Sequence, residues 1–196
     1  MQAYSNACEK NKASILAVLK TAFKSSKHVL EIGSGTGQHA VFFAEHLPHL
    51  RWQTSDVAQN HTGINEWINA FPSANLKRPL ALDLSEPQWP NGTYDAVFTA
   101  NTFHIISKPL VEAFFKRAAE YLTTDGTLCI YGPFNYQGQF TSESNQAFDL
   151  WLKVKSATSG IRDFEWVNEL AENEGLFLVD DHTMPANNRL LEFIKR

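Results

Sequence analysis

The amino-acid sequence predicts a single α/β domain built on a mostly parallel, Rossmann-like sheet with helices on both faces. Three observations predict this fold class: strand and helix signals alternate along the chain, a glycine-rich turn follows the first strand, and a short segment joins the last two strands. The chain has 196 residues, 43% of them hydrophobic, which suffices for one sizeable core. We therefore expect one domain over residues 1–196.

The first half of the chain contains three helix signals and four strand signals. Apolar residues at helical spacing predict the first helix, Pro48 ends the second, and an Asn91-Gly92 turn precedes the fourth strand. The second and third strands lead into Asp56 and Asp83. The predicted helices are 9–23, 40–47 and 63–71, and the predicted strands are 29–32, 50–54, 80–82 and 94–100.

The second half continues the alternation. Ser107 as a cap and Pro109 in the first turn predict a helix, and an Asp125-Gly126 turn leads into the fifth strand. The stretch 132–144 is long for a connection, which is typical of a functional loop. Because 180–188 is too short for a crossover helix, the last two strands must pair antiparallel. Helices 145–155 and 163–174 and strands 127–131, 176–179 and 189–194 complete seven strands in the order 3-2-1-4-5-7-6, with strand 7 antiparallel.

The most informative segment is 29–40, where an apolar strand ends beside Glu31 and a turn with three glycines opens onto a helix. Glycines lack the Cβ atoms that keep a backbone away from a ligand. A dinucleotide-binding turn, Gly-x-Gly-x-x-Gly, requires a glycine where this chain has Gln38. The spacing Gly-x-Gly-x-Gly instead resembles that of class I methyltransferases, which bind S-adenosylmethionine (SAM). It predicts cofactor contacts for Gly33, Gly35 and Gly37.

Acidic residues stand at or just after the first three strands. In an open parallel sheet the ligand lies outside the carboxyl ends of the strands. We expect Glu31 to meet the cationic methionine amine of SAM, Asp56 to accept both ribose hydroxyls, and Asp83, with its neighbour Leu84, to contact the adenine. Each acid alone is equally typical of a helix cap or a turn, and their shared position after successive strands favours a cofactor site.

Three further side chains follow strands four and five. Methyl transfer requires that nucleophile and methyl be held in line, and it needs a base only where the acceptor loses a proton. We predict His104 as that base, Asn101 as an orienting group for the acceptor or the cofactor, and Tyr131 as a group beside the acceptor. A lone histidine in an apolar run is also typical of core packing. The aromatic and amide-rich stretch 131–140 suits a small or peptide-like acceptor, or only covers the end of the sheet.

Composition argues against several other classes of protein. Lys and Arg total 17 and Asp and Glu total 21, a net charge of −4, so nucleic acid is not an expected partner. Cys8 and Cys129 indicate neither a disulfide framework nor a zinc site, and no histidine spacing suggests a metal. No leader-like segment is present and no apolar run reaches about 18 residues, so we expect a soluble, cytoplasmic protein.

Several segments together resemble the methyltransferase-like protein 26 family, domain of unknown function 938, within the class I SAM-dependent methyltransferase superfamily. They are 11–12, 31–39, 101–104, 131–134, 140–145, 160–163 and 184–189. One departure is Lys10, where the family more often has arginine, so a bidentate contact to an anion becomes a single one. The resemblance implies that distant polar residues converge near the pocket, with Asn11 folding over the cofactor: Asn11, Asn145, Arg162, Asp163 and Asn187.

The sequence thus predicts a SAM-dependent methyltransferase with an unidentified acceptor, preferably a small molecule. The alternative is a non-catalytic SAM-binding regulatory or scaffold protein whose pocket is filled or closed. An open cavity beside Asn101, His104 and Tyr131 favours the enzyme, and side chains packed into it favour the binding protein. An NAD-linked oxidoreductase fits least well because of Gln38.

Overall fold

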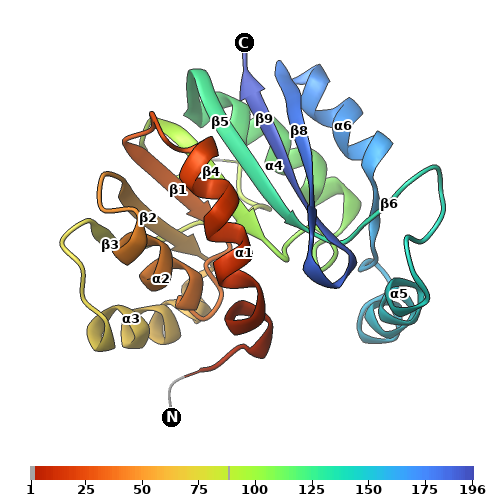
Figure 1. The fold of residues 1–196 in the computed structure, drawn as a ribbon, viewed down its shortest axis with the longest axis horizontal. Coiled ribbons are helices and arrows are strands. Elements are labelled where there is room, and N and C mark those ends of the chain that lie inside the picture. Colours follow the sequence, from red (N-terminus) through yellow and green to blue (C-terminus); the bar gives the residue numbers. More distant parts are fainter. Residues whose placement is uncertain (1–2, 88) are drawn as a thin grey trace.

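The computed structural model describes residues 3–87 and 89–196, which form a seven-stranded sheet between two groups of helices (Figure 1). The strand order is β3-β2-β1-β4-β5-β9-β8. β9 pairs antiparallel with β5 and with β8, and the other pairings are parallel. The predicted order is confirmed, since β8 and β9 are the sixth and seventh strands of this sheet. Its strands are β1 (His28–Ile32), β2 (Arg51–Asp56), β3 (Leu76–Ala81), β4 (Tyr94–Ala100), β5 (Leu122–Gly132), β8 (Leu176–Met184) and β9 (Asn188–Lys195).

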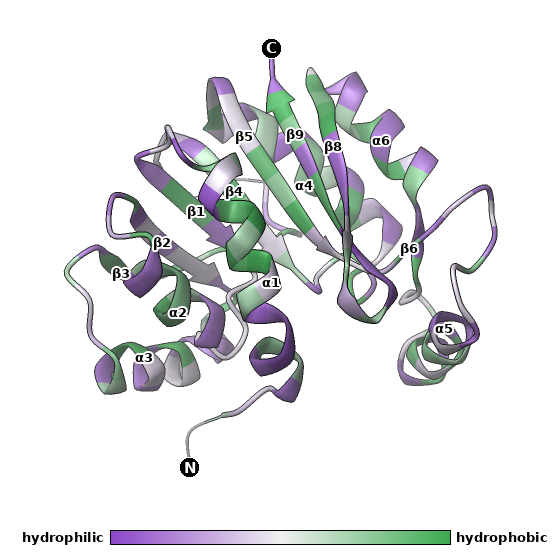
Figure 2. Cartoon of the chain, in the orientation of Figure 1, coloured by the Kyte–Doolittle hydropathy of each residue, from purple (hydrophilic) through white to green (hydrophobic). Residues whose placement is uncertain are grey.

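Alternate residues of the central strands divide between two hydrophobic cores. Val29 and Phe98 pack towards α1, α2 and α3, whereas Leu30 and Val97 pack towards α4 and α6. Figure 2 shows the matching pattern on the helices, where hydrophobic and hydrophilic residues alternate along α1 and α6. The helices are α1 (Asn6–Ala22), α2 (Gln38–His46), α3 (His61–Ala70), α4 (Lys108–Tyr121), α5 (Glu143–Lys155) and α6 (Phe164–Asn173), with short 3-10 turns at Ala58–Asn60 and Pro185–Asn187.

The carboxyl ends of β1, β4 and β5 lie at one end of the sheet. The start of α1, helix α5 and the turn between β8 and β9 gather at the same end (Figure 1). Segments from both termini and from the middle of the chain therefore meet where an open parallel sheet binds its ligand.

Three strands are at least twice as long as the sequence predicts. β3 begins at Leu76 and contains Pro79, which an edge strand tolerates because one of its sides has no partner. β8 continues to Met184, so the connection to β9 is shorter than predicted. β5 begins at Leu122 and includes the predicted Asp125-Gly126 turn, with Asp125 at a φ of 61°.

The stretch 132–144, predicted as a loop, contains a small element of its own. β6 (Phe134–Asn135) pairs in parallel with β7 (Arg162–Asp163) in a separate two-stranded sheet. The prediction was wrong here because two-residue strands carry no periodicity that a sequence can show.

Within residues 3–87 and 89–196, no helix has the length and hydropathy that crossing a membrane requires. In that same part of the chain, no three His, Cys, Asp or Glu side chains gather where they could hold a metal ion. Cys8 and Cys129 are free thiols, half-buried and buried respectively.

Candidate functional site

The three glycines after β1 differ in what surrounds them. All have positive φ angles, 73° at Gly33, 57° at Gly35 and 89° at Gly37, a region that favours glycine. A Cβ atom at Gly33 would lie 3.0 Å from Thr102 Oγ1, and one at Gly37 would lie 3.1 Å from the Cα atom of Ile64. A Cβ atom at Gly35 would meet nothing within 4 Å. The outer glycines therefore allow close packing, while the middle one faces open space.

Glu31 is almost fully buried beneath this turn. Its Oε2 atom accepts hydrogen bonds from Ser34 Oγ at 2.9 Å and from Trp52 Nε1 at 3.1 Å. Burial raises the pKa of Glu31 to about 7, the two hydrogen bonds oppose this rise, and the charge of Asp56 adds to it. No described residue donates a hydrogen bond to Oε1, so this atom is free to meet a donor.

Asp56, the last residue of β2, ties the glycine turn to the second strand. Its Oδ2 atom accepts from the Gly35 N–H at 2.7 Å. Its Oδ1 atom accepts from the Val57 N–H and from Asn60 Nδ2, both at 2.8 Å. A carboxylate offers about four acceptor positions, so three protein donors leave room for roughly one hydroxyl of a ligand. Asp56 thus lies where the sequence predicts. Its carboxylate has too few unoccupied acceptor positions to bind both ribose hydroxyls.

Asp83 and Leu84 follow β3, as predicted, but the carboxylate of Asp83 is exposed. It accepts from the Ser85 N–H at 2.8 Å and from Ser85 Oγ at 2.7 Å, and these two bonds lower its pKa. This is the turn geometry that aspartate adopts without any ligand. The half-buried Leu84 packs against the core on the α4 side of the sheet.

A cavity of about 490 Å³ opens beside the ends of β4 and β5. Asn101, which follows β4 with a φ of 58°, donates its backbone N–H to the Tyr131 carbonyl at 2.8 Å, and both residues line the cavity. Burial raises the pKa of the Tyr131 phenol, so the phenol is neutral at pH 7. The other lining residues come from α1, α5, Pro133 and the β8–β9 turn: Asn6, Ala7, Lys10, Asn11, Ser144, Asn145, Phe148, Pro185, Ala186 and Asn188.

His39 is a site residue that the sequence did not single out. Its Nε2 atom lies 2.7 Å from Asn11 Oδ1, and because an amide oxygen only accepts, His39 carries its proton on Nε2. Burial, followed by the charge of Lys12, lowers the pKa of His39 to about 4. Asn11 also lies close enough to the Tyr131 phenol to oppose the rise in the Tyr131 pKa, and both residues line the cavity. His39 on α2 thereby supports Asn11 from behind the cavity.

His104 is buried beside the cavity but is not among the residues that line it. Its ring packs edge-on against Phe148, with ring centroids 5.3 Å apart. Burial lowers the pKa of His104 to about 4, and the nearby Arg162 charge adds to this effect. The imidazole is therefore neutral at pH 7. This position is the one expected of a histidine that packs in the core. A base in direct contact with an acceptor would line the cavity.

The residues that the resemblance brings together fall into two places. Asn11 and Asn145 line the cavity at Tyr131, and the Asn187 carbonyl accepts from Asn145 Nδ2 at 3.1 Å. Arg162 and Asp163 instead line a second cavity of about 600 Å³. Arg162 donates from Nε to the Phe103 carbonyl at 3.1 Å and from Nη2 to the Thr158 carbonyl at 2.7 Å. The expected convergence was wrong for these two, since Arg162 fixes the backbone behind the loop after β4.

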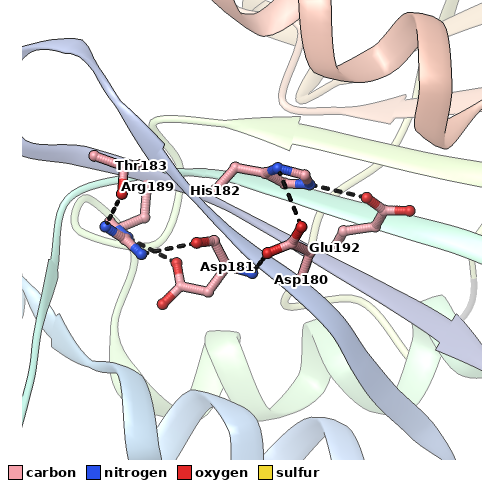
Figure 3. A network of polar contacts seen from close by, with 6 residues as sticks. All are labelled: Asp180, Asp181, His182, Thr183, Arg189 and Glu192. Carbon is pink, nitrogen blue, oxygen red and sulfur yellow. Dashed lines mark hydrogen bonds and ion pairs between the residues drawn. The ribbon is translucent and has the colours of Figure 1, made fainter.

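A polar network on the β8–β9 hairpin anchors the chain that borders the cavity (Figure 3). Arg189 donates from Nε to Asp181 Oδ1 at 2.7 Å and from Nη1 to Thr183 Oγ1 at 2.6 Å. Tyr136, which follows β6, donates to Asp181 Oδ2 at 2.7 Å, and burial raises its pKa so that it keeps this proton. The hairpin and the segment after β5 are therefore held together. Figure 3 also shows a second group on the same strands, made of Asp180, His182 and Glu192.

We expect the free energy of unfolding to fall as the pH drops from 7 to 4.5. His39 and His104 have folded-state pKa values of about 4 against an ordinary 6.5, so the stability present above pH 6.5 is lost as the pH falls towards 4. Glu31, raised from 4.5 to about 7, opposes this trend, because its contribution is fully present below pH 4.5 and is lost as the pH rises to 7. The two histidines outweigh Glu31, so the free energy of unfolding should fall by roughly 2 kcal/mol on acidification, which urea unfolding measures.

The Glu31→Gln variant provides the control for this prediction. It removes the opposing contribution, so its stability should fall more steeply between pH 7 and 4.5 than that of the unmodified protein. Equal stabilities at the two pH values in the unmodified protein would contradict the buried, neutral state of the two histidines.

Comparison with known proteins adds a family and a set of structural neighbours. The model of a family described as "Protein of unknown function (DUF938)" matches residues 2–195. An O-methyltransferase family protein from Burkholderia thailandensis superposes with a TM-score of 0.84 at 16% identity, over 94% of this chain and 56% of that one. Human N-acetylserotonin methyltransferase in complex with SAM gives 0.81 at 13% identity, over 96% of this chain and 52% of that one.

A third neighbour is an O-methyltransferase family 2 protein from Planctomyces limnophilus in complex with apigenin. It gives a TM-score of 0.83 at 18% identity, over 97% of this chain and 58% of that one. The chain thus spans little more than half the length of these three proteins. At such identities the likeness establishes the shared fold.

Proposed function

The chain belongs to the family described as proteins of unknown function (DUF938), and we propose that it is a SAM-dependent methyltransferase with a small-molecule acceptor. The observation that carries this proposal is the open space at Gly35, between Glu31 and Asp56, at the same end of the sheet as the cavity at Asn101 and Tyr131. One opening suits a cofactor and the other suits an acceptor. Membership of the methyltransferase-like protein 26 family and a cytoplasmic location are parts of this proposal that rest on the sequence.

The residues around the glycine turn fit SAM. SAM supplies an electrophilic methyl group on a sulfonium that carries a cationic amine and a nucleoside. The free Oε1 atom of Glu31 is the atom we assign to the amine, and the remaining acceptor position of Asp56 is assigned to a ribose hydroxyl. We assign no contact to Asp83 and Leu84, which the sequence predicts for the adenine, because the exposed Asp83 carboxylate already accepts two hydrogen bonds from Ser85. The SAM bound to the human neighbour supports this cofactor.

We assign the orientation of the acceptor to Asn101 and Tyr131. A backbone hydrogen bond joins the two residues at the edge of the cavity, and Tyr131 is buried, so their positions are set before a ligand arrives. His104 stays a prediction as a base, since its ring packs on Phe148, which lines the cavity, while His104 itself is not among the described lining residues. The open cavity favours an enzyme over a scaffold protein. The apigenin bound to the Planctomyces neighbour supports a small-molecule acceptor.

Calorimetric titration with SAM tests the cofactor half of the proposal. We expect binding at pH 6.5 to release a fraction of a proton, because Glu31, with a pKa of about 7, must ionise to meet a cationic amine. The release appears as a binding enthalpy that differs between phosphate and imidazole buffers. Glu31→Gln should bind more weakly and show no such difference. Absence of SAM binding to the folded, unmodified protein would sink the proposal.

Incubation with methyl-labelled SAM and a cell extract tests the acceptor half. After fractionation by size, we expect the label in the metabolite fraction rather than on protein or nucleic acid. The Asn101→Ala variant, which retains the glycine turn, serves as the matched control and should reduce the labelled product. SAM binding without any transferred label would favour the regulatory alternative.

A further inference from the structure

We propose that the acceptor is a small planar carboxylate whose anionic group is held by Lys10. This inference rests on the proposed function and names the substrate class of the cavity at Asn101 and Tyr131. Three features of the cavity favour such an acceptor: its charge, the direction of the α1 side chains, and the combination of flat apolar and hydrogen-bonding surfaces.

The charge of the cavity is positive in a chain with a net charge of −4. Lys10 is the only charged side chain among the described residues that line it. Tyr131 keeps its proton because burial raises its pKa. No carboxylate of the described part of the chain lines this cavity, so a cationic acceptor would meet repulsion and an anionic one would meet Lys10.

Helix α1 directs Lys10 towards the cavity and Lys12 away from it. Asn6, Ala7, Lys10 and Asn11 all line the cavity, which is the i, i+1, i+4, i+5 pattern of one helical face. Lys12 instead forms an ion pair with Glu9 at 2.5 Å and lies 4.8 Å from the centre of the Phe42 ring. Glu9, the nearest carboxylate along the chain, is thereby engaged and does not neutralise Lys10.

The remaining lining suits a flat ring that carries a hydrogen-bond donor. Phe148 is held edge-on by His104 and is stacked on Trp151 with centroids 5.8 Å apart, so its ring is fixed, and Pro133 also lines the cavity. Asn145 uses Nδ2 to donate to Thr141 Oγ1 at 2.9 Å and to the Asn187 carbonyl at 3.1 Å. Its Oδ1 receives no hydrogen bond from the described residues and is free to accept one from a ligand hydroxyl.

A pair of ligands that differ only in charge tests the inference. The probes are 3-hydroxy-2-naphthoate and its neutral amide, 3-hydroxy-2-naphthamide, titrated into the full chain with S-adenosylhomocysteine present and absent, with amide NMR shifts as the readout. We expect the carboxylate to bind about fivefold more tightly than the amide, the upper range for a solvent-accessible ion pair. The preference should shrink at high salt.

Three lysine variants distinguish a specific contact with Lys10 from a general effect of net charge. Lys10→Gln should abolish the preference for the carboxylate and Lys10→Arg should keep it, while Lys12→Gln, which changes the net charge equally, should leave it intact. The inference is overturned if the amide binds as well as the carboxylate, if Lys10→Gln keeps the preference, or if the shifts map to the second cavity at Arg162. The calorimetric titration with SAM is a separate measurement. If the protein binds SAM but shows no preference for the carboxylate, this inference is rejected and the proposed function is not. Loss of SAM binding rejects both.

Discussion

Replacing Gly37 by alanine should destabilise the protein by roughly 3 kcal/mol, lowering its melting temperature by about 10 °C. Gly37 has a φ of 89°, and the new methyl group would lie 3.1 Å from the Cα atom of Ile64, a backbone atom that cannot turn away. The left-handed backbone alone costs about 1 kcal/mol, and the clash with α3 adds the rest. Thermal unfolding followed by circular dichroism measures the change.

Gly35→Ala is the matched partner of this variant. Its φ of 57° carries a similar backbone cost, but its methyl group would meet nothing within 4 Å. We therefore expect a loss of only about 1 kcal/mol of stability, together with SAM binding weakened more than about tenfold, because the methyl group occupies the space assigned to the cofactor. A folded Gly35→Ala protein that binds SAM normally would show that the turn does not enclose this ligand.

The sheet could be predicted from the sequence because its signals are local. β4 matches its predicted limits of 94–100, since an Asn91-Gly92 turn and an apolar run define it on the chain itself. The alternation of elements predicted a parallel sheet, and the short last connection predicted its antiparallel final pair. The order of the seven strands was implied by the resemblance to class I methyltransferases, and it is confirmed. β3 was predicted too short because Pro79 argues against a strand unless the strand is known to lie at an edge.

The positions of the residues predicted for the cofactor could also be derived from the sequence, because each lies at the end of a strand or in the turn after it. Gly35 and Asp56 lie 21 positions apart, and the meeting of parallel strand ends brings them within 2.7 Å. The acceptor side could be predicted only in part. Asn11 and His39 come from different helices, and the contact between them depends on how α1 packs on α2, which no spacing along the chain encodes.

The separation of Arg162 from the Tyr131 cavity has a similar cause. A sequence shows that an arginine is present, but only the fold shows that its guanidinium donates to the backbone carbonyls of Phe103 and Thr158. These bonds stabilise the backbone after β4, and Arg162 is not among the described residues that line the Tyr131 cavity. The charge available to an acceptor therefore comes from α1 at Lys10, at the opposite end of the sequence.

Asp56→Ala should weaken SAM binding by about 100-fold while leaving the protein folded. The variant removes the acceptor position assigned to a ribose hydroxyl. It also frees the Gly35 N–H from its 2.7 Å bond and the Val57 N–H from its 2.8 Å bond, so the turn loses one of its ties to β2. The bonds of the Gly33 and Ser34 N–H groups to the Ser55 carbonyl remain and keep the turn folded. Each lost charge-assisted hydrogen bond costs roughly 1.5–3 kcal/mol. Part of this cost is offset because Gly35 is exposed, so water can replace the carboxylate as the partner of its N–H group. Calorimetric titration with SAM measures the change.

Asp83→Ala is the control that distinguishes this role from a general loss of negative charge. Both changes remove one carboxylate that follows a strand, but Asp83 is exposed and bonds only to Ser85 among the described residues. We expect its SAM affinity to stay within about threefold of the unmodified protein. If Asp83→Ala lost as much affinity as Asp56→Ala, the adenine contact predicted from the sequence would be supported, and the Ser85 bonds would have to open when the ligand binds. If Asp56→Ala kept its affinity, the assignment of a ribose hydroxyl to the Asp56 carboxylate would be wrong.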